Sequence, residues 1–135
     1  MQHPFITFLM ERQLIPAHAS RHLSGMRALV REPIGMIAVG HGLLAAHEID
    51  RILDRQREST DRFGEIAVEM GVLTAEQVET LIKIQEFRTA SAICEALSLA
   101  GILPCEDAFR YLGAYLAGDA EMLAMLTQPG DAAEA

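Results

Sequence analysis

Residues 33–56 have the sequence PIGMIAVGHGLLAAHEIDRILDRQ, and residues 62–85 have the sequence RFGEIAVEMGVLTAEQVETLIKIQ. Each of these 24-residue motifs has a glycine in its third position, a second glycine seven residues later, an apolar pair after it and a glutamine at its end. A spacer of five residues, 57–61, separates the motifs. Two copies of one pattern in a short chain indicate a protein built from repeated supersecondary units.

The repeat extends beyond these two motifs. Nonamers that align with one another begin at residues 8, 37, 66 and 96, with the sequences FLMERQLIP, IAVGHGLLA, IAVEMGVLT and ALSLAGILP. An amphipathic segment follows each nonamer. The first and last copies depart most from the pattern, as expected of terminal repeats that face solvent on one side.

Each copy is predicted to form a short helix, a tight turn and a longer helix. In the second motif, Asp61 is a candidate N-cap for a helix over 62–70, and Gly71 is the expected left-handed residue that ends this helix. Thr74 and Gln77 have the spacing of a capping box for the next helix.

The longer helices are predicted to carry one apolar face that ends in a glutamine. This face comprises Ile49, Ile52, Leu53 and Gln56 in the first motif and Val78, Leu81, Ile82 and Gln85 in the second. Gly42 corresponds to Gly71 in the first motif, and Pro16 and Pro104 are expected at helix starts in the outer copies.

No segment alternates apolar and polar residues in the manner of a β-strand. We therefore predict an all-α fold of tandem helix-turn-helix repeats of about 29 residues. The expected organisation is a degenerate N-terminal repeat over 1–32, the tandem motifs over 33–85, a degenerate C-terminal helical repeat over 86–127 and a disordered tail over 128–135.

Composition and charge exclude several classes of protein. The 135-residue chain is 50% apolar and 22% charged, which is typical of globular proteins. No apolar run approaches the ~18 residues that a membrane span needs, and no signal peptide is evident, so we expect a bacterial, cytoplasmic protein. The net charge is +1 over residues 1–60 and -9 over residues 61–135, which argues against a DNA or RNA partner.

Neither the cysteines nor the histidines form a pattern with chemical meaning. Cys94 and Cys105 are interpreted as apolar filler without a disulfide. His18 and His22 have a spacing that metal ions use, but no carboxylate or cysteine completes a site, so no metal is expected. The chain also lacks a phosphate-binding loop and a nucleophile–base arrangement. We therefore do not expect an enzyme.

Two features of the motifs suggest a ligand rather than architecture alone. Gly35 and Gly64 fall at the starts of the short helices, where glycine costs about 1 kcal/mol against alanine. Bare backbone at a helix start can allow the close approach of a phosphate. Gln56 and Gln85 recur at the edge of the apolar face, where an amide can both donate and accept hydrogen bonds.

The twin motifs resemble the MshEN domain, which is the N-terminal domain of the MshE pilus ATPase and of related type II secretion ATPases. That family carries two such motifs with a five-residue spacer, and residues 33–85 match this arrangement. The resemblance implies that each motif binds one half of cyclic-di-GMP. Apolar side chains would contact a guanine, while an arginine and a glutamine would add polar contacts.

The resemblance assigns the following ligand-binding residues. In the first motif they are Ile34, Gly35, Ala38, Gly42, Ile49, Leu53 and Gln56. In the second motif they are Arg62, Phe63, Gly64, Ala67, Gly71, Val78, Ile82 and Gln85. The chain departs from the family pattern at Pro33, which replaces an arginine, and at Ala38 and Ala67, which replace larger aliphatic residues. Arg31 is a candidate substitute for the missing arginine.

Two functions are compatible with these features. The first is a stand-alone cyclic-di-GMP receptor that signals to a protein partner by fixing the relative orientation of two repeats. The alternative is a docking or scaffold module of a secretion, pilus or signalling assembly that does not need the nucleotide. In the alternative, the motifs are architecture only.

Overall fold

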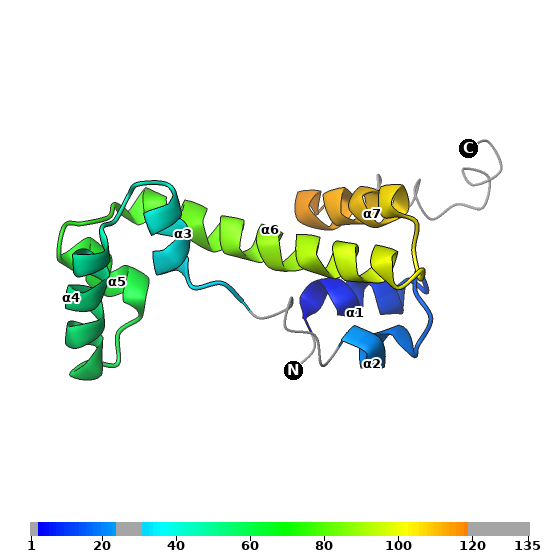
Figure 1. The fold of residues 1–135 in the computed structure, drawn as a ribbon, viewed down its shortest axis with the longest axis horizontal. Helices are drawn as coiled ribbons and strands as arrows, with labels where there is room; N and C mark the ends of the chain where they lie inside the picture. Colours follow the sequence, from blue (N-terminus) through cyan, green and yellow to red (C-terminus); the bar gives the residue numbers. More distant parts are fainter. Residues whose placement is uncertain (1–2, 24–30, 119–135) are drawn as a thin grey trace. The chain divides into compact units, whose positions relative to one another are not determined.

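The computed structural model describes residues 3–23 and 31–118 (Figure 1). Within these residues every regular element is a helix, so the all-α prediction is confirmed for them. The predicted tail, 128–135, lies outside the described residues, as do parts of both outer repeats. The helices are α1 (Pro4–Glu11), α2 (Ala19–Leu23), α3 (Ile34–Gly40), α4 (Ala46–Arg57), α5 (Phe63–Glu69), α6 (Ala75–Leu99) and α7 (Cys105–Ala117).

The chain divides into two compact units, each with its own core. Of the described residues, 3–23 and 89–118 belong to the discontinuous unit and 31–88 to the inserted unit. The long helix α6 contributes its first half to the inserted unit and its second half to the discontinuous unit. Both predicted motifs therefore lie within the inserted unit.

The discontinuous unit packs α1, α2 and α7 around the second half of α6 (Figure 1). Its core includes Phe5, Leu9, Leu23, Ile93, Leu97 and Leu112, all 2% exposed or less. The ring of Tyr115 packs against the rings of Phe5 and Phe8, with centroids 5.1 and 5.2 Å away. Burial of each large apolar side chain contributes roughly 1.5–3 kcal/mol, so these contacts dominate the stability of this unit.

The inserted unit draws corresponding positions of the two motifs into one core. Its fully or almost fully buried side chains are Ile37, Ala38, Leu44 and Ile52 from the first motif and Ile66, Ala67, Leu73 and Leu81 from the second. Each residue of the first set occupies the same motif position as one of the second set. In addition α4, from the first motif, packs against α5, from the second.

Four turns in the chain share one backbone geometry. Residues in the left-handed region occupy the same nonamer position in each, with φ of 56° at Gln13, 74° at Gly42, 75° at Gly71 and 74° at Gly101. The N–H of the next residue donates to the carbonyl five residues earlier at 2.8–3.1 Å in all four turns, for example from Leu43 to Ala38. This is the Schellman arrangement, which satisfies the last carbonyls of a helix. The left-handed conformations predicted for Gly42 and Gly71 are therefore confirmed.

The helix starts agree with the sequence in part. Thr74 and Gln77 form the predicted capping box, since Thr74 N donates to Gln77 Oε1 at 2.9 Å and Gln77 N donates to Thr74 Oγ1 at 3.1 Å. The N-cap of α5 is Arg62 instead of the predicted Asp61, whose N–H donates to Ser59 Oγ. Pro104 is the N-cap of α7, whereas α2 starts three residues after Pro16.

The fourth copy differs from the prediction of a separate short helix before its turn. Residues 75–99 form one continuous helix, so the short helix of that copy is the end of α6. The segment between Gln85 and Ala96 contains no glycine or proline. Nothing in it interrupts the helical hydrogen bonds, and the helix therefore continues into the discontinuous unit.

Candidate functional site

The predicted ligand residues fall into three structural groups. The first group, Gly35, Ala38, Gly64 and Ala67, is buried in the inserted unit. The second, Gly42 and Gly71, forms exposed left-handed turns. The third comprises the remaining residues, which lie on or near the surface. The structure therefore gives several of these residues an architectural role that does not depend on a ligand.

Gly35 and Gly64 pack against side chains of neighbouring helices. A β-carbon added to Gly35 would lie 2.8 Å from Cζ of Phe63, and one added to Gly64 would lie 2.6 Å from Cγ1 of Val78. Real β-carbons almost never come so close to another heavy atom, so a side chain at either position would force the neighbouring side chain to shift, and glycine allows the close packing seen here. The expectation that these glycines expose bare backbone to a phosphate is therefore wrong.

The same contacts relate the two motifs reciprocally. Phe63, the second residue of its motif, lies against the glycine in the third position of the other motif, Gly35. Ile34, the second residue of the first motif, lies against Gly64, with Cδ1 3.6 Å from an added β-carbon. Equivalent residues thus meet across the junction where α3 and α5 begin, as in a local two-fold arrangement.

Several predicted residues around this junction remain accessible. Leu53 and Ile82 occupy the same position in the two motifs and are 39% and 49% exposed. Ile34, Phe63 and Val78 are half-buried and pack on the core of the inserted unit. Ile82 follows Val78 by one helical turn, so the two lie on the same face of α6. Ile49 and Gln56 are half-buried on α4.

Arg62 is an exposed arginine beside the junction of α3 and α5. It precedes Phe63 and Gly64 directly, and no ion pair joins it to another residue of the described ranges. Arg31, the candidate substitute for the arginine missing at Pro33, lies 4.0 Å from the carboxylate of Glu86. Its guanidinium is therefore already beside a counter-charge.

Gln85 connects the end of the second motif to the segment before α3. Its Nε2 donates to the main-chain oxygen of Glu32 at 2.8 Å. The carboxylate of Glu32 in turn accepts from Arg88 Nη1 at 2.7 Å. These contacts join the place where the chain enters the inserted unit, at Arg31, to the place where it leaves, at Arg88. We call this arrangement the Glu32 clasp.

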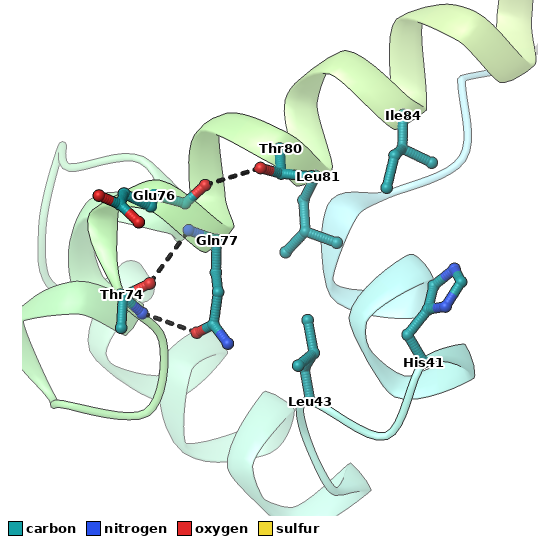
Figure 2. Close-up of a pocket in the computed structure, with 8 residues that line it drawn as sticks. All are labelled: His41, Leu43, Thr74, Glu76, Gln77, Thr80, Leu81 and Ile84. Atoms are coloured by element: carbon teal, nitrogen blue, oxygen red, sulfur yellow. Dashed lines mark hydrogen bonds between the residues drawn. The ribbon is translucent and has the colours of Figure 1, made fainter.

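A pocket of about 430 Å³ lies in the inserted unit. It is lined by His41, Leu43, Thr74, Glu76, Gln77, Thr80, Leu81 and Ile84. Figure 2 shows Leu43 and Leu81 pointing toward one another, with Gln77 and His41 on opposite sides. The two hydrogen bonds of the Thr74–Gln77 capping box hold the amide of Gln77 in place on one side of this pocket. None of the residues carried over from the MshEN pattern lines this pocket.

His41, on one side of this pocket, directly precedes Gly42 in the turn after α3. The other side of the pocket is formed by residues at the start of α6, which belong to the second motif. The two sides come together because the turn of the first motif packs against the long helix of the second motif. The residue spacing within one motif does not predict this contact.

The cysteines differ in environment. Cys94 is fully buried, and its thiol donates to the main-chain oxygen of Ala108 at 3.3 Å. Burial, reinforced by Cys105 and Glu95, raises the pKa of Cys94 from 9.0 to about 12. Cys94 is thus apolar filler, as predicted, whereas Cys105 is exposed at the first position of α7 and is not.

Among residues 3–23 and 31–118, no group of three or more His, Cys, Asp or Glu side chains has the geometry of a metal site. In the same part of the chain, no helix combines the length and apolar character required to cross a membrane. Comparison of the chain with protein-family models, with curated proteins and with solved structures gives no significant match.

Proposed function

We propose that the chain is a tandem-repeat protein whose inserted unit is an MshEN-like domain, and that it binds cyclic-di-GMP and signals this to a protein partner. The observation that carries the proposal is the reciprocal packing of the two motifs at the junction of α3 and α5, where Phe63 meets Gly35 and Ile34 meets Gly64. A ligand made of two equivalent halves is complementary to a surface on which equivalent residues are related in this way.

The accessible side chains at this junction have the chemistry that a guanine base requires. Ile34, Phe63, Val78 and Ile82 offer an apolar surface that is only partly covered. Arg62 adds a guanidinium that can stack on a base or form paired hydrogen bonds with its acceptor edge or with a phosphate. Recognition in this proposal rests on side chains, because the glycine backbones are occupied by packing.

The proposal implies unequal half-sites. Arg62 serves the second motif, whereas the first motif has Pro33 at the equivalent position. A charge-assisted hydrogen bond contributes about 1.5–3 kcal/mol, so one absent arginine lowers the affinity by roughly ten- to a hundredfold relative to a site with two. The expected affinity is therefore modest.

A docking module without nucleotide is the second candidate. One observation favours it: packing and hydrogen bonding within the protein account for the recurring features of the motif, including the buried glycines, Ala38, Ala67 and the Glu32 contact of Gln85. Exposed apolar side chains such as Met36, at 54%, and Val68, at 38%, would then contribute to a protein interface.

Calorimetric titration of the full chain with cyclic-di-GMP separates the two candidates. We expect heat of binding with the wild type and a ten- to a hundredfold weaker Kd for Arg62→Ala, in line with the loss of one charge-assisted contact. Arg51→Ala is the matched control, because Arg51 is also exposed but lies outside the predicted ligand set.

A second pair of variants tests the apolar contact. Ile82→Ser should weaken binding, whereas Phe87→Ser, which alters a side chain of similar exposure on the same helix outside the motifs, should not. Absence of heat and of thermal stabilisation at high micromolar cyclic-di-GMP would reject the receptor proposal and favour the docking module.

A further inference from the structure

The pocket beside His41 combines an apolar part with polar side chains around it. Leu43, Leu81 and Ile84 form the apolar part, and the leucines point toward one another across the pocket (Figure 2). Leu81 is 2% exposed and belongs to the core, whereas Leu43 is 36% exposed and lies outside it. The volume of about 430 Å³ falls within the roughly 300–1,000 Å³ that is typical of ligand sites. The pocket therefore has room for a large aliphatic side chain between the two leucines.

The amide of Gln77 offers a hydrogen-bond donor beside this apolar part. Its oxygen accepts from the main-chain N–H of Thr74 at 2.9 Å, and its nitrogen points away from Thr74 (Figure 2). No acceptor among residues 3–23 and 31–118 receives a hydrogen bond from this nitrogen. The capping box holds the amide in place, so the donor is already oriented. A main-chain carbonyl of a bound peptide can accept from it.

The charge at the pocket is negative. The described lining residues include Glu76 but no lysine or arginine, and Glu76 forms no ion pair within the described ranges. Between Arg62 and Lys83 the chain contains four glutamates, all of them exposed, and no basic residue. A surface with this charge repels acidic segments and favours a partner that carries lysine or arginine.

We propose that this pocket is the docking site for a peptide segment of a protein partner in which a large aliphatic side chain lies next to lysine or arginine. The aliphatic side chain enters between Leu43 and Leu81, the main chain of the segment accepts from Gln77, and the cation pairs with Glu76. This inference rests on the part of the proposed function that names a protein partner, and it does not require the nucleotide.

Selection from a random peptide library displayed on phage, with the full chain as bait, tests the chemistry of the occupant. We expect enrichment of sequences in which a large aliphatic residue lies beside lysine or arginine. In the selected peptide that binds most tightly, replacement of the aliphatic residue by serine should weaken binding by about ten- to a hundredfold, because burial of one large apolar side chain is lost. Enrichment of acidic sequences, or of no sequence, would overturn the proposal.

Variants of the protein locate the binding site of the selected peptide. Leu43→Ser should weaken binding about fivefold, because the exposed part of Leu43 is the part that the peptide covers. Leu53→Ser is the matched control, since Leu53 is 39% exposed and does not line the pocket. Equal losses in both variants, or a loss in neither, would place the peptide elsewhere and overturn the docking site.

A second pair of variants tests the charge. Glu76→Gln should weaken binding by up to about fivefold, the upper range for an exposed ion pair, and should reduce its dependence on salt. Glu79→Gln, which alters an exposed glutamate of the same helix outside the pocket, should have a smaller effect. Equal effects of the two variants would contradict the pairing with Glu76. Binding that depends on the pocket, in a chain that gives no heat with cyclic-di-GMP, would reject the receptor proposal and leave this inference intact.

Discussion

Gly64 of α5 and Val78 of α6 are so close that a β-carbon on residue 64 would lie 2.6 Å from Cγ1 of Val78. The stiff, branched side chain of valine cannot turn away without a change of rotamer. The short helix of the second motif therefore rests directly on the long helix of the same motif. The absence of a side chain at residue 64 is what allows this contact.

Gly64→Ala is expected to destabilise the protein by about 1 kcal/mol. The methyl group overpacks the contact with Val78, which typically costs about 1–3 kcal/mol, and the better helix propensity of alanine offsets about 1 kcal/mol of it. Equilibrium denaturation in urea, followed by circular dichroism, measures the difference.

Two further variants isolate the cause. In a Val78→Ala background, Gly64→Ala should become neutral or stabilising, because the atom that the methyl group meets is gone. Gly113→Ala is the control inside α7, where an added β-carbon meets nothing within 4 Å. It should stabilise the protein by about 0.5–1 kcal/mol through helix propensity alone. Equal effects of Gly64→Ala in both backgrounds would contradict the close-packing account.

The sequence shows that glycine occurs at the start of each short helix, but it does not show which contact requires glycine there. Glycine at the start of a helix is compatible with a ligand or with a neighbouring helix, and only the tertiary contact decides between the two. For Gly35 the partner is Phe63, which belongs to the other motif. Local features such as the turn at Gly71 and the Thr74–Gln77 box were predictable, because all of their hydrogen bonds lie within a few residues.

The pocket beside His41 and the Glu32 clasp were not predictable for the same reason. Each brings together segments from distant parts of the sequence, as in the contact between Glu32 and Gln85. The motif pattern marked Gln85 as a residue at the edge of an apolar face. It held no information on the residue that its amide would meet.

The turn after α1 yields a second prediction, since Gln13 has a φ of 56° where the three equivalent turns have glycine. A residue with a side chain is strained in the left-handed region by about 1–2 kcal/mol, and glycine removes this strain. Glycine also loses more conformational entropy on folding, which offsets about 0.5–1 kcal/mol of that stabilisation. Gln13→Gly should therefore raise the free energy of unfolding by about 0.5 kcal/mol, measured by urea denaturation.

The reverse substitution, Gly71→Gln, should lower it by about 0.5 kcal/mol, because the φ of 75° at that position is retained by the surrounding hydrogen bonds and the same two terms then act with opposite sign. Gln13→Ala serves as the control, since alanine is strained in the same conformation, and it should change little. A stabilising Gln13→Ala would show that the effect comes from the glutamine side chain and not from the backbone.

The thiol of Cys94 gives a pH-dependent prediction. Burial raises its pKa from 9.0 to about 12 in the folded protein, so the fold favours the neutral thiol. The resulting contribution to stability is fully present below pH 9, where the thiol is neutral in both the folded and the unfolded state. It is lost as the pH rises from 9 toward 12, because ionisation of the thiol then stabilises only the unfolded chain. Urea denaturation of the wild type and of Cys94→Ala should therefore show a stability difference that is constant from pH 7 to about 8.5 and shrinks progressively up to about pH 10.5.

The same burial predicts unequal reactivity of the two thiols. In the native protein at about pH 8, a thiol reagent should modify the exposed Cys105 rapidly and Cys94 only on unfolding, because the reactive thiolate of Cys94 is both inaccessible and disfavoured. Mass spectrometry of the native and the urea-unfolded chain measures the extent of modification. Cys105→Ser is the control that should remove the rapid phase. Rapid modification of both thiols in the native chain, or a stability difference that does not vary with pH, would refute the buried, neutral state of Cys94.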